Sequence, residues 1–420
     1  MGKVPLVGEV RSMDSAAMVE ASEMSAASTD GASARRDRAL VIAHRGASGL
    51  APENTLVAIE EAARQGADFV EVDVVLTSDG VPVLFHDRTL RRTTNVAELY
   101  PERADAPVSA FTLAELRKLD AGSWFDDAYA GVQIATLDEA LEVLREHGLG
   151  LWAELKSPVP NPDLVRATVD VLRRTPGDWL DDRTRLTVTS FNLDVLARFV
   201  EEVGPDVTVG AIAERVPDDA TLRELARWVD FFVPNQRKLR AGDIVRMRAA
   251  GLRTAFWTPN DPVSAVALLV QGADGLIQNY PAVMTALVAG RPPFPEPTVV
   301  IERVAVSGTD TPGGPDGRDG DQATAHAPEP ATAAHVVLRN VADRPVDVTG
   351  WFLRDDPGYR VHIGADQPIP AGGTLSVYVG PDASVAGSGG AGVFNRARSS
   401  VALHRADGSL ADVVSGEPRP

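Results

Sequence analysis

The sequence contains no cysteine among its 420 residues. This excludes disulfide bonds, thiolate metal sites and thiol catalysis, but not an exported location, because exported proteins can also lack cysteine. No apolar run approaches membrane-spanning length. Basic residues are fewer than acidic ones, 41 against 59, and the formal net charge is −18. That balance argues against a non-specific binder of nucleic acid or anionic membranes, although a local basic pocket could still hold one phosphate.

The length exceeds what a single hydrophobic core usually serves, which predicts two domains. Residues 1–38 are small and polar and end near a charged ARRDR cluster, a composition typical of a disordered segment. The apolar stretch PLVG near the start is too short for a secretory signal, and acidic residues interrupt the sequence after it. We therefore expect a cytoplasmic protein.

Between residues 39 and 290, short β-branched runs alternate with longer amphipathic ones. The strand-like runs are ALVIAH, ADFVEVDVVL, GLWAELK, RLTVTSF, VTVGAIA, DFFVPN, LRTAFWT and DGLIQN. Eight strands alternating with helices over about 250 residues are typical of an α/β protein with a (β/α)8 TIM barrel. A doubly wound sheet is the alternative, but no glycine-rich phosphate loop follows the first run.

The second run departs from this alternation. Its continuation, VEVDVVLTSDGVPVLFHD, leaves no room for a helix between two apolar halves, so the halves cannot be parallel neighbours. The Asp-Gly pair at 79–80 is the one preferred in a two-residue type I′ turn, and we expect a small hairpin insertion here. That turn pairs Ser78 with Val81 and sets His86 opposite Asp73. A shift of one residue would place His86 on the other face.

From residue 88 to 133 the pattern has no clear period. A loop this long inside a compact domain is usually functional or disordered. Its aromatic residues Trp124, Phe125 and Tyr129 favour an ordered cap over the barrel mouth. A simple packing role for these side chains is the alternative.

The remainder of the chain has a different composition. A proline-rich stretch, RPPFPEP, spans residues 291–297 and is typical of a linker. Residues 298–420 contain short strand-like runs with turn residues and no helical period, which predicts an all-β immunoglobulin-like sandwich. The stretch at about 308–334 is rich in Gly, Asp, Pro and Thr, and we expect it to be a disordered insertion.

Acidic residues mark the ends of two strand-like runs. Glu71 and Asp73 are two residues apart and share one face of the second run, and Glu154 lies near the end of the third. In a TIM barrel the carboxyl ends of the strands meet at the face that binds ligands. Hard cations prefer oxygen ligands, so three carboxylates without cysteine favour Mg²⁺ or Ca²⁺ over zinc. We predict a divalent cation bound by these three residues.

Basic residues lie close to the same strand ends. Hydrolysis of a phosphodiester needs charge neutralisation, a proton taken from the nucleophile and a proton given to the leaving oxygen. His44 and His86 are the candidate acid and base. Arg45 can hold a phosphate with its forked guanidinium, and Lys156, on the face of Glu154, can hold a phosphate oxygen. We predict these four as catalytic residues, with Arg45 and Lys156 also binding the substrate.

Each of these signals alone has an ordinary structural explanation, such as a paired core histidine or a solvated strand face. Their combination at strand ends on one barrel face disfavours those explanations. We expect Glu53 to bind substrate, although an acid and Asn54 after a proline also suit a helix start. Trp257 and Asn260 lie at the end of the seventh run and are expected at the floor of the substrate pocket, with core packing as the alternative for Trp257.

The motifs HRG, PENT, ExD, DG…HD and ExK occur in this order between His44 and Lys156, followed by SF and WTPN. Together they resemble the glycerophosphodiester phosphodiesterase family over about residues 39–290. The resemblance implies a (β/α)8 fold and hydrolysis of glycerophosphodiesters to sn-glycerol 3-phosphate and an alcohol. It also implies a divalent cation on the three carboxylates, with His44 and His86 as general acid and base. In the implied mechanism a substrate hydroxyl attacks the adjacent phosphate, and water opens the resulting cyclic phosphate.

Two positions depart from the family pattern. The last strand commonly ends in an acid before Tyr-Pro, where this chain has Asn279. A proline is common where this chain has Ala135. Neither is a predicted metal or proton-transfer residue, so both departures concern the substrate pocket rather than activity.

The C-terminal runs resemble the lamin-tail domain through the GW pair at 350–351 and the later GGTLSVYVG. The resemblance implies an immunoglobulin-like module for binding or targeting, with an unknown ligand or partner. We expect its histidines His335, His362 and His404 to lie at the surface.

The expected partner of the whole chain is a small-molecule glycerophosphodiester, with no nucleic acid and no integral membrane segment. A lysophospholipase D-type phosphodiesterase is the alternative enzyme, which a long apolar lining of the segment 88–133 would favour. A non-catalytic binding protein targeted by the sandwich domain is the alternative of another class. It is disfavoured because no predicted histidine or metal carboxylate is missing.

Overall fold

The computed structural model of this protein describes residues 38–156, 162–305, 335–356, 358, 360–364, 368–378 and 400–415. The predicted disordered insertion at about 308–334 lies outside the described residues. So does the predicted N-terminal segment, with the exception of Arg38. That residue forms an ion pair with Asp68 at 2.7 Å, just before the second strand of the barrel.

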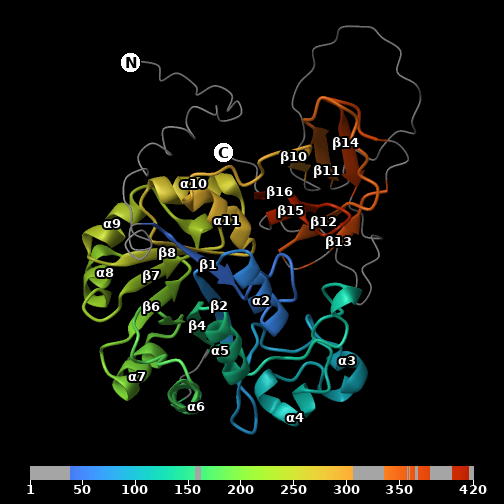
Figure 1. The fold of residues 1–420 in the computed structure, drawn as a ribbon. Helices are drawn as coiled ribbons and strands as arrows, with labels where there is room; N and C mark the ends of the chain where they lie inside the picture. Colours follow the sequence, from blue (N-terminus) through green and yellow to red (C-terminus); the bar gives the residue numbers. More distant parts are fainter. Residues whose placement is uncertain are drawn as a thin grey trace, which may run out of the picture.

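Eight parallel strands close into a barrel (Figure 1). They are β1 Leu40–His44, β2 Phe69–Leu76, β4 Gly150–Leu155, β5 Leu186–Ser190, β6 Thr208–Ala213, β7 Phe231–Pro234, β8 Arg253–Trp257 and β9 Gly275–Gln278. Pairing of β1 with both β2 and β9 closes the ring. The prediction of a TIM barrel is confirmed, and the doubly wound alternative is wrong, since an open sheet would have two unpaired edges.

Helices fill the connections between the barrel strands. They are α2 Leu56–Arg64, α5 Leu137–Glu146, α6 Pro162–Arg174, α7 Leu193–Val203, α8 Asp219–Leu225, α9 Asp243–Ala249, α10 Pro262–Val270 and α11 Pro281–Val288. Side chains cap several of their first turns, as in α5, where Thr136 and Glu139 form a capping box. Within the described ranges, no helix is long and apolar enough to cross a membrane.

Aromatic side chains fill the inside of the barrel beneath its carboxyl end. Trp152 is fully buried, and the centre of its ring lies 6.2 Å from that of Phe69 and 5.0 Å from that of Phe231, edge-on in both cases. Strand residues two apart share a face, so the next inward positions on β2 and β4 are Glu71 and Glu154. The aromatic layer is therefore the floor on which the polar side chains of the barrel mouth stand.

The predicted hairpin is present, but its predicted register is wrong by one residue. Strand β3, Pro82–Leu84, pairs antiparallel with β2, and Val74 lies opposite Leu84. The backbone N–H of Phe85, rather than His86, therefore faces Asp73 and donates to its carbonyl at 2.9 Å. Because β3 ends at Leu84, the position of His86 is not restricted to one face of the strand.

The loop of this hairpin has three residues instead of the two expected. The N–H of Thr77 donates to the carbonyl of Val81 at 3.0 Å, and the Thr77 hydroxyl accepts the N–H of Val81 at 2.9 Å. Gly80 has a φ of 81°, whereas Asp79 is not among the residues with positive φ. A type I′ turn requires positive φ at both positions, so the turn is of another type.

The segment between β3 and α5 is an ordered lobe beside the barrel (Figure 1). It contains α3 Val96–Leu99, α4 Leu113–Leu116 and the 3-10 turns Pro101–Arg103, Val108–Ala110 and Asp127–Tyr129. Two of its aromatic residues, Trp124 and Phe125, lie at the junction with the C-terminal strands. The Arg354 guanidinium sits 3.6 Å from the centre of the Phe125 ring, and a side chain at Gly358 would collide with Trp124.

Two antiparallel sheets follow the barrel. One contains β10 Val299–Ala305, β11 His335–Asn340 and β14 Thr374–Tyr378, and the other contains β12 Phe352–Asp355, β13 Arg360–His362, β15 Ser400–His404 and β16 Leu410–Ser415. Apolar residues of both sheets, such as Val336, Leu353 and Leu403, form one shared core. Two sheets around one core are a β-sandwich, which confirms the all-β prediction. The lamin-tail resemblance stays a prediction.

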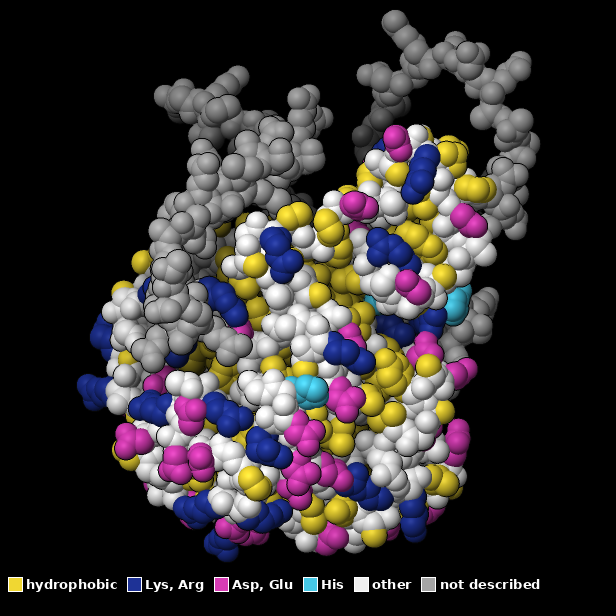
Figure 2. Space-filling model, in the orientation of Figure 1, with side chains coloured by type: hydrophobic (Ala, Val, Ile, Leu, Met, Phe, Trp, Pro, Cys, Tyr) yellow, Lys and Arg dark blue, Asp and Glu magenta, His cyan; other side chains and the backbone are white. Residues whose placement is uncertain are grey.

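The four-stranded sheet packs on the barrel, and the two parts meet without a break in the space-filling view (Figure 2). Ala402 and Val413 of this sheet belong to the main core of the barrel. The prediction that His404 lies at the surface is wrong, because it is 1% exposed. Its ring stacks on Phe352 with 4.7 Å between centres and lies 6.3 Å from that of Tyr280, at the start of α11.

Candidate active site

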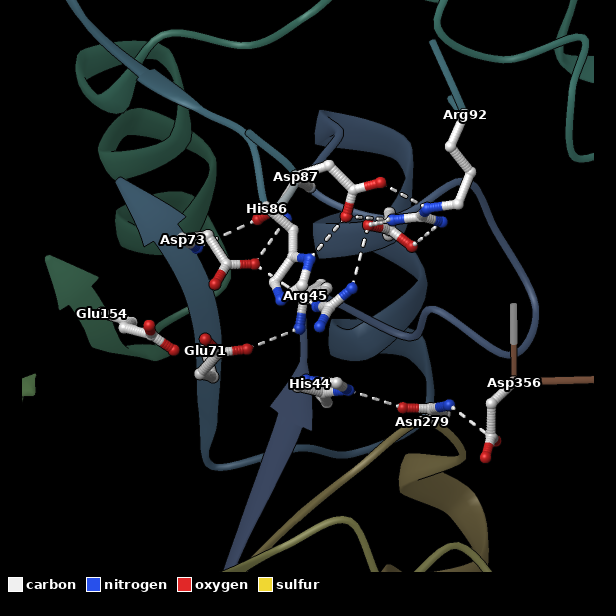
Figure 3. A network of polar contacts seen from close by, with 12 residues as sticks. His44, Arg45, Glu71, Asp73, His86, Asp87, Arg92, Glu154, Asn279 and Asp356 are labelled. Carbon is white, nitrogen blue, oxygen red and sulfur yellow. Dashed lines mark hydrogen bonds and ion pairs between the residues drawn. The ribbon is translucent and has the colours of Figure 1, made fainter. Parts of the chain in front are cut away.

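Three carboxylates meet at the carboxyl ends of β2 and β4 (Figure 3). Glu71, Asp73 and Glu154 each offer one oxygen, and these oxygens all lie within 4.8 Å of one another. The parallel register places Asp73 directly beside Glu154. Glu71 is 4% exposed and Asp73 is 1% exposed. The structure thus brings together the three residues predicted to bind a metal.

The three carboxylates change one another's protonation. Burial, followed by the charges of Asp73 and Glu154, raises the pKa of Glu71 well above its ordinary value. Burial and Asp73 also raise the pKa of Glu154. For Asp73 burial acts in the same direction, but positive groups led by Lys156 outweigh it and lower the pKa. A set of three hard oxygen donors, two buried and one partly buried, with excess negative charge fits Mg²⁺ or Ca²⁺.

Asn54 holds Asp73 from the loop before α2. Its Nδ2 donates to Asp73 Oδ2 at 2.8 Å, and its Oδ1 accepts the backbone N–H of Asp73 at 3.1 Å. Asn54 has a φ of 57°, in the left-handed region that Asn tolerates better than most residues. The side chain of Thr55, not that of Asn54, caps α2. The interpretation of Asn54 as a helix cap is therefore wrong, and PENT is the signal that points to its role.

Arg45 connects the end of β1 to the acidic cluster. Its backbone N–H donates to Glu71 Oε2 at 2.8 Å, and its guanidinium pairs with Glu53 at 3.0 Å and with Asp73 at 3.3 Å. Burial acts to lower the pKa of Arg45, but the carboxylates of Glu53 and Asp73 raise it. The atom nearest Asp73 is the buried Nε, which makes this ion pair but no hydrogen bond with any described residue. Arg45 is thus a charged donor beside the three carboxylates, and its predicted contact with a phosphate stays a prediction.

Lys156 lies on the β4 side of the cluster. Its Nζ is 3.1 Å from Glu154 Oε1 and 3.4 Å from Asp73 Oδ1. Burial acts to lower the pKa of Lys156, and the two carboxylates raise it more. The ammonium group therefore offsets part of the excess negative charge. Its predicted contact with a phosphate oxygen stays a prediction.

His44 is held at the end of β1 by a residue from the end of the barrel. Its Nδ1 lies 2.8 Å from Oδ1 of Asn279, which follows β9. Burial, and then the charge of Arg45, lowers the pKa of His44 to about 3. The imidazole is therefore neutral at physiological pH, and a neutral ring has one nitrogen free to accept a proton.

His86 is held by a chain of charged groups (Figure 3). Its Nδ1 lies 2.7 Å from Asp87 Oδ1, and Arg92 pairs with Asp87 and with Glu53, each at 2.7 Å. Burial acts to raise the pKa of Asp87, but hydrogen bonds from His86 and Arg92 lower it. A carboxylate only accepts hydrogen bonds, so Nδ1 of His86 carries the hydrogen. Its Nε2 is then the nitrogen left for a substrate.

Neither Asp87 nor Arg92 was predicted as a site residue. The available signal for Asp87 was its position directly after His86, and Arg92 belongs to the aperiodic segment 88–133. Glu53 lies between the two arginines Arg45 and Arg92. Burial acts to raise the pKa of Glu53, but these arginines lower it to about 2. Through its two arginine partners, Glu53 therefore links the loop after His44 to the residues that hold His86.

The two residues predicted at the floor of the substrate pocket, Trp257 and Asn260, have different surroundings from each other. Trp257 donates from Nε1 to the carbonyl of Val233 at 3.1 Å, and its ring meets Phe191 edge-on with 5.9 Å between centres. Phe191 is 47% exposed, so this aromatic pair is accessible at the mouth. Asn260 is 1% exposed and donates to Asp356 of the C-terminal domain at 2.8 Å. The prediction that Asn260 forms part of the pocket floor is wrong.

A comparison with known proteins agrees with this site. The model of the glycerophosphoryl diester phosphodiesterase family matches residues 44–283. The chain belongs to this family. The prediction of a phosphoric diester hydrolase is therefore confirmed. The matched range contains all the predicted catalytic and metal residues and ends before β10, so the C-terminal sheets lie outside it.

Proteins that are named glycerophosphodiester phosphodiesterases are similar to this chain over somewhat more than half of its length. That of Bacillus subtilis is 31% identical over 265 residues, which cover 58% of this chain and 85% of the relative. That of Caldanaerobacter subterraneus is 31% identical over 255 residues, 60% of this chain and 98% of the relative. A solved phosphodiesterase from Oleispira antarctica, in complex with the product sn-glycerol-3-phosphate, is 34% identical with a TM-score of 0.53. The match covers 60% of this chain and 97% of the Oleispira antarctica chain.

Proposed function

We propose that this protein hydrolyses glycerophosphodiesters to sn-glycerol 3-phosphate and an alcohol with a divalent cation. Of the two histidines expected to act as acid and base, we assign the base of the first step to His44 and the acid to His86. The observation that carries the proposal is the placement of two differently partnered histidines beside three carboxylates, of which Glu71 and Asp73 are buried (Figure 3). The relative from Oleispira antarctica, solved with sn-glycerol-3-phosphate, supports the choice of product.

His44 suits the general base. It is neutral because burial lowers its pKa to about 3, and its Nδ1 is engaged by Asn279. In the first step the substrate hydroxyl next to the phosphate forms a bond to phosphorus, and Nε2 of His44 takes the proton of that hydroxyl. The residue is already fixed before substrate binds, which reduces the entropy lost on reaching the reactive geometry.

His86 suits the general acid. The Asp87 carboxylate at 2.7 Å stabilises an imidazolium, as a carboxylate does for a catalytic histidine in general. As the bond between phosphorus and the alcohol oxygen breaks, Nε2 of His86 gives that oxygen its proton. In the second step water opens the cyclic phosphate, and the two histidines exchange roles.

Glu71, Asp73 and Glu154 would hold the cation. Bound there, a divalent cation would supply positive charge that offsets the negative charge of the phosphate and of the transition state. Arg45 and Lys156 add two further positive charges on opposite sides of Asp73. Both contact the carboxylates that would hold the cation, so a phosphate bound beside that cation would lie within reach of their N–H groups and of the two histidines.

The segment 88–133 favours a small polar substrate over a lysophospholipid. Most of its large apolar residues form a separate core within the lobe, which includes Leu90, Phe111 and Leu116. All three side chains are fully buried. They are therefore not available to line a groove for an acyl chain, which is what the lysophospholipase D alternative needs.

The test is the release of sn-glycerol 3-phosphate from glycerophosphocholine, followed by ³¹P NMR. We expect EDTA to abolish release and added Mg²⁺ or Ca²⁺ to restore it. A rate that ignores the chelator would contradict the metal requirement. A different phosphate product, such as phosphocholine, would contradict the assigned bond cleavage.

A further inference from the structure

The C-terminal sandwich reaches the barrel next to His44. Asp356 directly follows β12 and is only partly exposed. Its Oδ1 accepts from Nδ2 of Asn260 at 2.8 Å and from Nδ2 of Asn279 at 3.4 Å. Asn260 and Asn279 follow β8 and β9, at the barrel mouth, and both are buried. A residue of the second domain is therefore one contact away from the residue that binds His44 (Figure 3).

Among the described residues, each hydrogen-bond partner of Asp356 offers it a donor. Besides the two amides, the backbone N–H of Ser400 donates to Oδ2 at 2.7 Å, and the Ser400 hydroxyl donates to Oδ1. Burial raises the pKa of Asp356. The Ser400 hydroxyl can accept as well as donate, but the two amide NH₂ groups at Oδ1 and the backbone N–H at Oδ2 can only donate. Asp356 therefore acts as an acceptor on both oxygens.

The orientation of the two side-chain amides follows from these donors. Asn260 Oδ1 accepts the backbone N–H of Asn279 at 2.8 Å, so its Nδ2 must point to Asp356. Asn279 has only one end that a carboxylate can accept from, which is Nδ2. With Nδ2 turned to Asp356, the Oδ1 of Asn279 points to His44.

This orientation selects one form of the neutral His44 ring. The carbonyl oxygen Oδ1 of Asn279 lies 2.8 Å from Nδ1 of His44 and only accepts, so the hydrogen of the ring sits on Nδ1. Nε2 is then the nitrogen with the free electron pair. If the amide of Asn279 turned over, its NH₂ group would require the opposite tautomer, and Nε2 could no longer take a proton.

We propose that Asp356 is a positioning residue of the active site, which acts through Asn279 to hold His44 in the tautomer that makes Nε2 the base. The C-terminal sandwich is accordingly part of the catalytic unit and not only a separate binding module. This inference rests on the proposed role of His44. Asp356 is needed because the amide of Asn279 has one donating and one accepting end. A second partner must decide which of these ends faces His44.

A carboxylate at position 279 would not need that partner, since both of its oxygens accept. The test therefore compares Asp356→Ala with the double variant Asp356→Ala/Asn279→Asp. Arg360→Ala serves as the control, because Arg360 also joins the two domains, through Asp126, without contacting Asn279. For each protein we would measure kcat on glycerophosphocholine with Mg²⁺, the unfolding midpoint and the His44 tautomer.

The tautomer is read from ¹⁵N NMR of the imidazole rings without substrate, and the His44 signals are assigned by their loss in His44→Ala. We expect the wild type to show hydrogen on Nδ1, and Asp356→Ala to lose this preference and about 10- to 100-fold in kcat. The double variant should regain both. An Nε2–H ring in the wild type would overturn the inference, even if Asp356→Ala does not fold.

The inference is also overturned if Asp356→Ala behaves like Arg360→Ala, or if the double variant regains neither property, because Asp356 would then have a purely structural role. A wild-type protein that does not turn over glycerophosphocholine would contradict the proposed function alone. The NMR comparison would still decide whether Asp356 selects the tautomer.

Discussion

Asn54 and Asp73 exchange two hydrogen bonds, from the amide Nδ2 to the carboxylate at 2.8 Å and from the Asp73 backbone N–H to the amide Oδ1 at 3.1 Å. The pair joins the loop before α2 to β2. Asp73 is the carboxylate that Lys156 and Arg45 approach from two sides. The placement of the central acidic group thus depends on a residue that would not itself contact the cation.

Replacing Asn54 by Ala should therefore weaken cation binding. Removing both hydrogen bonds leaves Asp73 free to turn toward Arg45 or Lys156, and changes of this kind commonly cost about 10- to 100-fold in metal affinity. Isothermal titration with Mg²⁺ measures the effect. Asn95→Ala is the matched control, since Asn95 accepts a backbone N–H within the lobe at 2.9 Å and lies outside the site. Equal affinities for Asn54→Ala and the wild type would contradict this role.

Glu53 should contribute to acid sensitivity. Its pKa is about 2 in the folded protein against an ordinary value of 4.5, so its ion pairs stabilise the fold fully above pH 4.5. That contribution, on the order of 3 kcal/mol, is lost as the pH falls from 4.5 to 2. The advantage of wild type over Glu53→Gln in urea unfolding should shrink across this window. For the control Glu224→Gln, at an exposed position on α8, the difference in unfolding free energy from wild type should not change across this window. A constant difference for Glu53→Gln would contradict the account.

Asp87 and His86 should act as one unit. Asp87→Asn places an NH₂ group or a weaker acceptor against Nδ1, and we expect kcat to fall about 10- to 100-fold with little change in KM. In a His86→Ala background the same substitution should cost almost nothing further, because the residue it orients is gone. A double-mutant cycle on the rate of product release measures this coupling. Additive losses would show that Asp87 acts through another group.

The barrel and its acidic cluster could be predicted because they depend on local patterns. Alternating strand and helix runs define the eight-stranded ring, and the two-residue period of a strand places Glu71 and Asp73 on one face. Parallel strands then bring Glu154 beside Asp73. The one distant contact among these steps, between β2 and β4, follows from the order of strands in the barrel.

The hairpin register could not be predicted in this way, because its turn depends on the lobe after it. Asp79 accepts a hydrogen bond from the Thr77 hydroxyl at 2.7 Å and another from the backbone N–H of Leu113 at 3.0 Å. These contacts accompany a three-residue loop, whereas the Asp-Gly pair alone favours two residues. The placement of His86 beside the site was nonetheless anticipated, although for the wrong geometric reason.

The partners of the two histidines were also beyond prediction. Asn279 lies 235 positions after His44, and Asp356 lies in a different domain. Arg92 comes from a segment without periodicity, so no strand or helix pattern pointed to it. Long-range polar contacts of this kind leave almost no trace in local sequence, since each residue alone also suits an exposed loop.

The central claim is a division of labour between the carboxylates, which hold the cation, and His44, which takes the proton. Its most direct test measures sn-glycerol 3-phosphate release and Mg²⁺ affinity in the same three proteins: wild type, His44→Ala and Glu71→Gln. We predict that His44→Ala binds Mg²⁺ like the wild type but releases product about 10²- to 10⁴-fold more slowly. Glu71→Gln should lose both properties. A His44→Ala protein that keeps the wild-type rate would contradict the account.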